Sequence, residues 1–407
     1  MRSPYLYDTL RRFCLGAFAV FDSDLRLGAD LPFAFEEHGT YGRPSLYEYR
    51  PLVRGFVEAR VERLYERRDV QDAVADLLRE PAAQIYAHAH AESAARDEAR
   101  ALYRSVLVPL LVRTAEGCGG FDWDDGAFDR AYAELEGSLY GEGHSYGAVA
   151  PLIGISVGTQ IDLGDGIRVR AAATGELAAM WPEATGLLPR SFGREPDRLC
   201  VLELERPLEQ GVDEGPDAPG ELADAVTAIR LATAAPVAAG PVLFERLDWR
   251  PYGVRPVLPI AATAPPGEPG RLDPFRASVA ASLRARLGLA DDDGRLGDAL
   301  DRWELALFQE DAFRGEQLRC ALDSALGEGD GAWAAAMRAA VLLGSTPEER
   351  AAIVERLRDP DTDLVRRLLV DVLLHGDRRR LVQELDAMLL ALRARPAAVS
   401  DLASRAS

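Results

Sequence analysis

Two amino acids, lysine and asparagine, are missing from this chain of 407 residues. All 47 basic residues are therefore arginines. The missing lysine excludes Schiff-base chemistry, a P-loop lysine and kinase-type catalysis, because each of these requires a lysine side chain. The missing asparagine excludes N-glycosylation. Since the codons of both residues are AT-rich, their absence indicates a GC-rich bacterial genome.

Cysteines are scarce, and long apolar runs do not occur. The four cysteines lie far apart with no C-x-x-C pair, so their spacing predicts neither a zinc site nor a dense disulfide framework. Such isolated cysteines favour a reducing, cytoplasmic location. The apolar stretch FCLGAFAVF at 13–21 is too short to span a membrane. We expect it to be a buried segment, and we expect no membrane partner.

Acidic residues outnumber basic ones by 66 to 47, which gives a formal net charge of −19. This balance argues against a protein that coats duplex DNA, because such proteins neutralise phosphates with basic side chains. The charge is uneven along the chain, however. Residues 366–395 contain seven arginines and four acidic residues and form a basic segment in an acidic protein.

The apolar pattern predicts an α+β protein that is mainly helical and has three domains. Residues 1–145 contain amphipathic stretches, the longest at 47–80, and predict a helical domain of unknown role. Residues 146–270 contain short Val-, Ile- and Leu-rich segments between Gly, Pro and Asp, with one helix-like stretch at 221–235. They predict a small strand-rich domain. Residues 271–407 predict an antiparallel helical bundle with short connections.

Two local motifs predict specific backbone features. In the C-terminal part, Thr346 can cap a helix, Pro347 suits its first position, and Glu349 can complete a capping box. In the middle part, Gly-Asp-Gly at 164–166 joins two strand-like segments. We interpret this tripeptide as a plain turn and not as a nucleotide-binding loop.

Histidine offers few candidates for metal or acid–base chemistry, since the chain has only five. On a helix, His88 and Glu92 would share one face, with His90 beside them, and metal-binding pairs use that spacing. No third ligand follows from the sequence, so a solvated helix face is the alternative. His38 and His144 lie in Gly-rich segments that we interpret as surface turns.

The fifth histidine, His375, stands at the end of an apolar helix inside the basic segment. Arginine can neutralise phosphate oxygens, and histidine, with an ordinary pKa of about 6.5, can take a proton from a ribose 2′-hydroxyl. This combination predicts metal-free phosphodiester chemistry. The alternative is that His375 only closes the helix, where an imidazolium interacts well with the helix dipole. The flanking arginines are Arg366, Arg367, Arg378, Arg379 and Arg380.

Several segments of the C-terminal third follow one another in a recognisable order. They are ALDRWELALFQ, the pair Glu310-Asp311, ALDSAL at 321–326, AWAAAMRAAVLLG, TPEERAAIVERLRD and a helix that ends in LLHG. VTAIRLATAAPVAAGPVLFERLDW precedes them. Over roughly 220–385 this run resembles the Apea-like branch of the HEPN domain family.

The resemblance implies a C-terminal HEPN-like helical bundle that acts on RNA without a metal or other cofactor, in antiphage defence or a stress response. It also implies a homodimer through this bundle, which brings two Arg-x4–6-His motifs together. By this resemblance, His375 is acid or base, Arg366 and Arg367 hold the scissile phosphate, and the product ends in a 2′,3′-cyclic phosphate. The remaining arginines, Arg378, Arg379 and Arg380, would bind the rest of the RNA.

The chain departs from the family motif in the spacing of arginine and histidine. The three positions at which the motif requires arginine, 368–370, hold Leu, Leu and Val. Arg367 leaves seven intervening residues before His375. On an ideal helix it lies about 80° from the His375 face and roughly 12 Å away along the axis.

Three functions therefore remain open. The first is a metal-independent endoribonuclease that uses His375. The second is an inactive HEPN module that dimerises or binds nucleotide or RNA. The third is a metal-dependent enzyme of the N-terminal domain that uses His88, His90 and Glu92.

Overall fold

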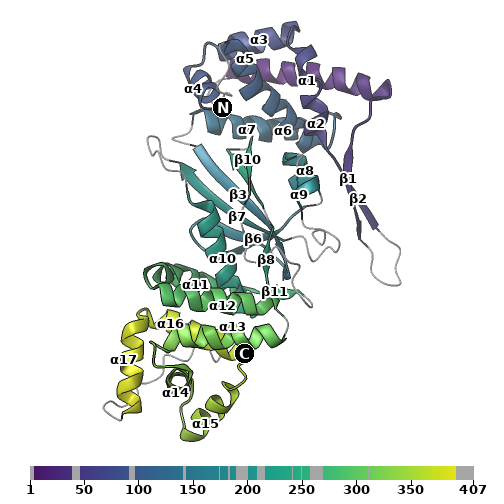
Figure 1. Cartoon of the computed structure of the whole chain (residues 1–407). Coiled ribbons are helices and arrows are strands. Elements are labelled where there is room, and N and C mark those ends of the chain that lie inside the picture. The colour runs from purple at the N-terminus through teal and green to yellow at the C-terminus, as the bar shows by residue number, and fades with distance from the viewer. Residues whose placement is uncertain are drawn as a thin grey trace.

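The computed structural model spans the whole chain. It describes residues 4–38, 46–90, 97–140, 144–173, 175–181, 184–188, 200–208, 216–240, 242–248, 250–256, 269–309 and 311–390. These residues form three layers, with N-terminal helices at one end, a sheet in the middle and C-terminal helices at the other end (Figure 1). The mainly helical α+β class expected from the sequence is confirmed. The division into three domains at 145 and 270 stays a prediction.

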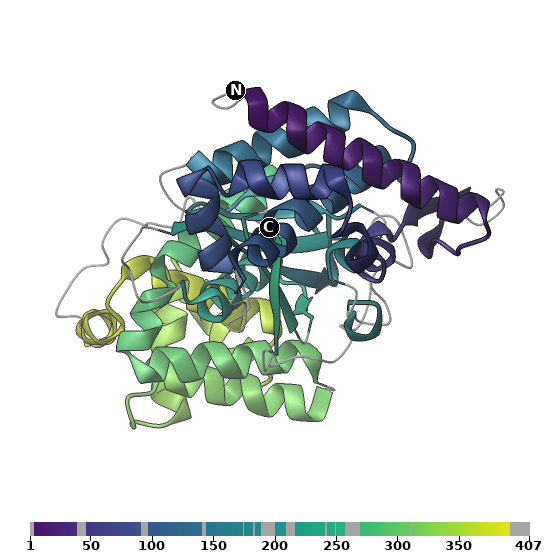
Figure 2. The same ribbon diagram turned by 90° about the horizontal axis from the view of Figure 1, so that it is seen from above.

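The N-terminal layer includes the long helix α1 (Pro4–Arg26), which buries Phe13, Cys14 and Phe21 of the apolar stretch. The expected burial of this stretch is therefore confirmed. Seen from above, α1 runs across the outer surface of the molecule (Figure 2). The other helices of this layer are α2 (Val53–Glu58), η1 (Val61–Leu64), α3 (Arg68–Leu77), α4 (Pro81–His90), α5 (Glu98–Leu102), η2 (Tyr103–Leu107), α6 (Val108–Cys118) and α7 (Asp125–Tyr140).

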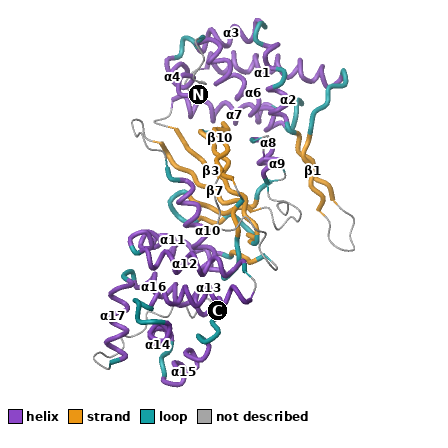
Figure 3. The backbone as a smooth tube through the Cα atoms, in the orientation of Figure 1, coloured by secondary structure: helices purple, strands orange, loops and turns teal. Residues whose placement is uncertain are grey.

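The N-terminal region also contains a two-stranded ribbon that the sequence reading did not predict. Strands β1 (Phe33–His38) and β2 (Leu46–Pro51) pair antiparallel and stand beside the sheet (Figures 1 and 3). The helical interpretation of 47–80 is wrong for its first residues, which form β2, and the remainder is divided among α2, η1 and α3. Pro51 lacks a backbone N–H and ends the strand, and its preceding residue is biased toward extended backbone.

The middle layer is a seven-stranded antiparallel sheet of order β10-β9-β3-β7-β6-β5, with β8 paired to β3. Gly164 and Gly166 adopt positive φ in the expected turn between β5 and β6. The sheet strands are β3 (His144–Ile153), β5 (Ile161–Asp162), β6 (Ile167–Ala171), β7 (Cys200–Leu208), β8 (Ala238–Ala239), β9 (Val242–Leu247) and β10 (Arg250–Pro256). Two further strands, β4 (Ile155–Val157) and β11 (Gly270–Leu272), pair parallel beside it, and the short helices α8 (Glu176–Met180) and α9 (Ala184–Leu187) follow β6.

The two faces of the sheet differ in chemistry because successive side chains of a strand point to opposite sides. One face carries Ala148, Val169 and Leu202, which belong to the same apolar cluster as helix α10 (Ala218–Thr233). The other face carries a buried carboxylate, Glu203, and three arginines that bind it. The Nε–Oε distances are 2.9 Å for Arg168 and Arg170, and an Nη of Arg246 lies 3.2 Å away.

Burial alone would raise the pKa of Glu203, but the hydrogen bonds from Arg168 and Arg170 outweigh it and lower the pKa to about 2. Gly147 on the adjacent strand makes room for this cluster. A Cβ at that position would lie 2.6 Å from Nε of Arg246. This charged cluster is therefore held together by ion pairs that the strands bring into register.

The C-terminal layer consists of helices that pack together. Its helices are α11 (Pro274–Asp292), α12 (Gly294–Phe308), α13 (Asp311–Leu326), α14 (Ala332–Leu343), α15 (Pro347–Arg356), α16 (Thr362–His375) and α17 (Arg378–Leu389). The capping box at the start of α15 is confirmed, since Oγ1 of Thr346 accepts from N–H of Glu349 and the Glu349 carboxylate accepts from N–H of Thr346.

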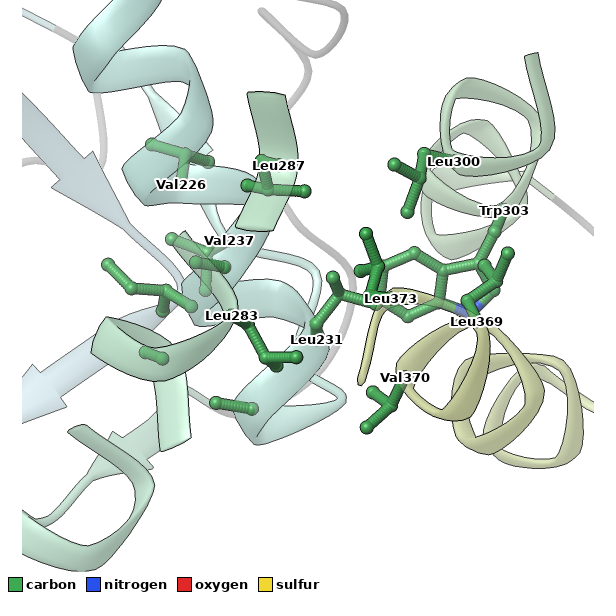
Figure 4. Packing of buried hydrophobic residues seen from close by; sticks show 14 of the residues in the cluster. Val226, Leu231, Val237, Leu283, Leu287, Leu300, Trp303, Leu369, Val370 and Leu373 are labelled. Atoms are coloured by element: carbon green, nitrogen blue, oxygen red, sulfur yellow. The ribbon is translucent and has the colours of Figure 1, made fainter. Parts of the chain in front are cut away.

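One hydrophobic cluster joins the sheet, α10 and the C-terminal bundle. In its centre, Leu231 of α10 lies against Trp303 of α12 and Leu373 of α16 (Figure 4). Trp303 is fully buried, and its indole N–H donates to the carbonyl of Thr362 at 3.0 Å. Arg230 and Glu304 add a buried ion pair of 2.6 Å between α10 and α12. Helix α16 is thereby fixed against the rest of the molecule, which positions its last residue, His375.

Candidate functional site

The candidate site lies at the junction of α16 and α17. Helix α16 buries an apolar face that includes Leu369 and Leu373 and ends at His375. Gly376 follows with φ of 85°, the left-handed conformation that glycine adopts most easily. Asp377 then caps α17 by accepting from N–H of Arg380 at 2.9 Å. This connection of two residues turns α17 back toward the His375 ring.

Both ring nitrogens of His375 face hydrogen-bond acceptors. Nδ1 lies 2.9 Å from the carbonyl oxygen of Asp377, and Nε2 lies 3.3 Å from Oε2 of Glu384. A neutral imidazole has only one N–H and can satisfy only one of these contacts, whereas the imidazolium satisfies both. Each ring nitrogen is therefore engaged by an acceptor from the chain itself. The His375 side chain remains 25% exposed.

Glu384 connects the histidine to an arginine on the same helix. Its other carboxylate oxygen accepts from Nε of Arg380 at 3.0 Å. The hydrogen bond from Arg380, together with that from His375, lowers the pKa of the Glu384 carboxyl below its ordinary value. One carboxylate therefore orients two cationic groups, and this set of three carries a net positive charge when the ring is protonated.

A further arginine reaches this end of α16 from a distant part of the chain. Arg286 of α11 donates from Nη1 to the carbonyl of Leu374 at 3.0 Å. Leu374 is the neighbour of His375, so this guanidinium group lies at the same helix end. The sequence reading missed Arg286, because nothing in the local sequence of α11 distinguishes it from the other arginines of that helix.

The two arginines of α16 assigned to the scissile phosphate have different surroundings. Arg366 donates to the carbonyl of Leu231 in α10 at 2.9 Å and to Oδ1 of Asp363 at 2.7 Å. It lies nine positions before His375, which on an ideal helix corresponds to roughly the opposite face. Arg367 is exposed and forms no ion pair with any residue the structure describes. Among the described residues, the hydrogen-bond partners of the His375 ring are Asp377 and Glu384, and neither of these two arginines is one of them.

The three arginines after His375 also divide into two kinds. Arg378 is buried and pairs with Asp293, at 2.7 Å, and with Glu328. Burial opposes ionisation of Asp293, but the hydrogen bond from Arg378 lowers the pKa of this carboxyl. Arg380 is exposed, as is Arg379, which has no ion-pair partner within the described part of the chain. Only the latter two present guanidinium groups to solvent.

The second candidate site, in the N-terminal domain, is described only in part. Glu92 lies outside the described residues, and so does the side chain of His88. The interpretation of His90 as part of a solvated helix face is wrong. Its side chain is 4% exposed, stacks on Tyr86 and lies 3.3 Å from Oδ2 of Asp248 in the sheet layer.

His90 therefore links α4 to the turn after β9. The α4 helix alone gives no signal for this contact, because Asp248 lies more than 150 residues away in the chain. Across the described ranges, no group of three His, Cys, Asp or Glu side chains is arranged to hold a metal ion. Within the same ranges, no helix combines the length and apolar content that a bilayer crossing requires.

No family model, curated protein or solved structure matches this chain in the comparisons with known proteins.

Proposed function

We propose that the C-terminal bundle is a HEPN-like module that binds RNA at the junction of α16 and α17 without cleaving it. The observation that carries this proposal is the pair of acceptors around His375, Asp377 and Glu384. The RNA-linked role in defence or stress rests on the resemblance of residues 220–385 to HEPN domains.

The hydrogen bonds of His375 support binding over general-base catalysis. A general base must direct an unprotonated nitrogen at the proton that it removes. Here a neutral ring would give up either the contact with Asp377 or that with Glu384. One of these contacts must be released before the ring can act on a substrate proton, and this supports binding over catalysis.

The exposed arginines supply the contacts that an RNA backbone requires. Arg379 and Arg380 lie in the first turn of α17, close to His375 in the chain, and Arg367 is exposed on α16. Because the chain lacks lysine, arginine is the side chain that supplies its permanent positive charge. Contacts of this kind bind phosphates without reading the base sequence.

Fluorescence anisotropy with a labelled single-stranded RNA tests this proposal. We expect Arg379→Ala/Arg380→Ala to weaken binding by about tenfold at low salt, and the difference to shrink as salt rises. The matched control is Arg319→Ala/Arg358→Ala, which removes the same charge from exposed positions on α13 and after α15. Equal affinities of the two double variants would refute binding at the α16–α17 junction.

Metal-independent RNA cleavage remains the second candidate function. The observation that favours it is the approach of two guanidinium groups, from Arg286 and Arg380, to the His375 end of α16. In this function His375 acts as an acid or base, and the arginines stabilise the phosphate in place of Arg366 and Arg367. The test is metal-free incubation with RNA beside the variant His375→Ala, which would abolish cleavage.

The homodimer through the C-terminal bundle is part of the same proposal. Two large aromatic side chains of this bundle, Phe313 and Trp333, are each 65% exposed. Exposed aromatic residues are typical of protein interfaces. Light scattering of the purified chain tests it: a dimer mass that Trp333→Ala reduces to the monomer mass is the expected result, and a monomer mass for the parent chain contradicts it.

A further inference from the structure

A groove in the N-terminal layer is lined by charged residues that play no part in the proposed RNA binding. It lies between α1 and α3 and has a volume of about 440 Å³. Small-molecule sites in proteins commonly have volumes of about 300–1,000 Å³. The groove is lined by Thr9, Arg12, Arg67, Arg68, Asp69 and Asp72.

The three arginines of the groove differ in how their charge is balanced. Arg67 forms a two-point ion pair with Asp69, with N–O distances of 3.0 and 2.8 Å. Among the described residues, Arg12 donates to neutral oxygens only, the Thr9 hydroxyl at 3.3 Å and the carbonyl of Asp8 at 3.4 Å. Arg68 has no ion pair or hydrogen bond from its side chain to a described residue. Two guanidinium groups in the groove therefore lack a carboxylate partner.

The backbone of α1 accommodates the balanced pair. Gly16 faces α3, and a Cβ at this position would lie 2.0 Å from Oδ2 of Asp69 and 2.8 Å from an Nη of Arg67. A glycine here lets Asp69 and Arg67 approach the helix and hold each other. Asp69 is thereby kept occupied with Arg67, which leaves Arg12 and Arg68 to a ligand.

Asp72 gives the groove a second chemical character. It is exposed, one turn after Arg68 on α3, and forms no ion pair with a described residue. Its carboxylate can accept hydrogen bonds from hydroxyl groups. A ligand complementary to the groove therefore has an anionic group that binds the two guanidinium groups and hydroxyl groups that donate to Asp72.

We propose that this groove binds a small phosphorylated sugar or nucleoside, with its phosphate between Arg12 and Arg68 and its hydroxyl groups toward Asp72. Guanidinium groups form strong, charge-assisted hydrogen bonds with phosphate, and a phosphate dianion matches two of them. The groove is larger than phosphate requires, which leaves room for the organic part. Binding here is independent of RNA binding at α16–α17.

Isothermal titration calorimetry on the full chain tests the proposal with ribose 5-phosphate, inorganic phosphate and ribose as probes. We expect saturable binding of ribose 5-phosphate, weaker binding of inorganic phosphate and no heat with ribose. Arg12→Gln/Arg68→Gln should weaken ribose 5-phosphate binding by at least about tenfold, because each lost contact is a charged hydrogen bond. The control Arg26→Gln, at the far end of α1, should leave binding unchanged.

A variant that gains affinity shows that the change in binding is not caused by misfolding. Asp72→Asn removes a negative charge from the groove, so it should tighten inorganic phosphate by about threefold while it weakens selection for the sugar. Arg379→Ala/Arg380→Ala should leave phosphate binding intact, which distinguishes this groove from the RNA site. Absence of ribose 5-phosphate binding, or equal losses in the Arg26 variant and the groove variant, would overturn the proposal.

Discussion

The buried and the exposed arginines of the C-terminal bundle differ in what their guanidinium groups contact. Arg378 is 1% exposed in its side chain and is surrounded by Asp293, Glu328 and the carbonyl of Ala325. Arg380, two residues later, is 71% exposed and shares one carboxylate with His375. The same residue type in the same basic segment therefore joins three helices in one position and presents charge to solvent in the other.

The same division recurs elsewhere in the bundle. Arg338 of α14 is buried and binds Asp330, Asp386 and the carbonyls of Leu326 and Gly327. Buried, ion-paired arginines add to the positive charge counted along the sequence, but their guanidinium groups are not accessible to a ligand in solvent. The difference shows that a basic segment predicts a binding surface only after its buried arginines have been removed from the count.

The largest effect that we predict is on stability, at Arg378. Arg378→Ala leaves two carboxylates and a carbonyl without their partner, so the unfolding free energy should fall by about 3–5 kcal/mol. Arg379→Ala, one residue away and exposed, should change it by less than about 0.5 kcal/mol. Urea denaturation measures both. A small effect at Arg378 would mean that it is no more structural than its exposed neighbour.

The next prediction concerns the buried carboxylate of the sheet. The folded pKa of Glu203 is lowered from 4.5 to about 2, so its ion pairs stabilise the fold above pH 4.5 and lose this contribution as the pH falls toward 2. In Glu203→Gln, the decline of stability in this window should be smaller by on the order of 2 kcal/mol, a value that allows for solvent screening. The exposed control Glu355→Gln should follow the parent chain. Identical acid-denaturation curves for the parent and Glu203→Gln would contradict the assignment.

A smaller effect on stability is expected at Arg366, whose side chain is less buried than that of Arg378 and less exposed than that of Arg380. Its contact with the carbonyl of Leu231 connects α16 to α10, and its contact with Asp363 lies within α16. Arg366→Ala should lower the unfolding free energy by about 1.5 kcal/mol, the size of one charged hydrogen bond. RNA affinity, measured by anisotropy, should stay the same. A loss of RNA affinity without a loss of stability would instead place Arg366 in the binding site.

The smallest effect that we predict is that of the His375 charge on binding. His375→Gln replaces a ring that can carry a positive charge with a neutral side chain, so RNA affinity at low salt should fall by about threefold. His375→Arg keeps the charge and should retain most of the affinity. If both variants lose affinity equally, the ring contributes through its shape or its proton chemistry and not through its charge.

The sequence predicts those features that depend on local pattern. The α+β class, the buried segment at 13–21 and the capping box at Thr346 follow from apolar periodicity and helix-start chemistry, and the structure has all three. The β1–β2 ribbon was missed because the apolar pattern that begins at residue 47 was interpreted as helical.

The surroundings of the candidate site depend on contacts between distant segments, which the local pattern does not contain. The basic segment around His375 is visible in the sequence, but the burial of Arg378 is set by Asp293 and Glu328 on other elements. The arrival of Arg286 at the end of α16 likewise results from the packing of α11. A one-dimensional charge count treats all of these arginines alike.

The central claim is that the α16–α17 junction binds RNA through fixed charge and leaves it intact. The most direct test is incubation of the full chain with end-labelled single-stranded RNA in the presence of EDTA, under conditions where anisotropy shows the RNA to be bound. We predict that the RNA remains full-length over the whole time course. Fragments ending in 2′,3′-cyclic phosphate, produced by the parent chain and absent with His375→Ala, would contradict the claim and establish the nuclease function.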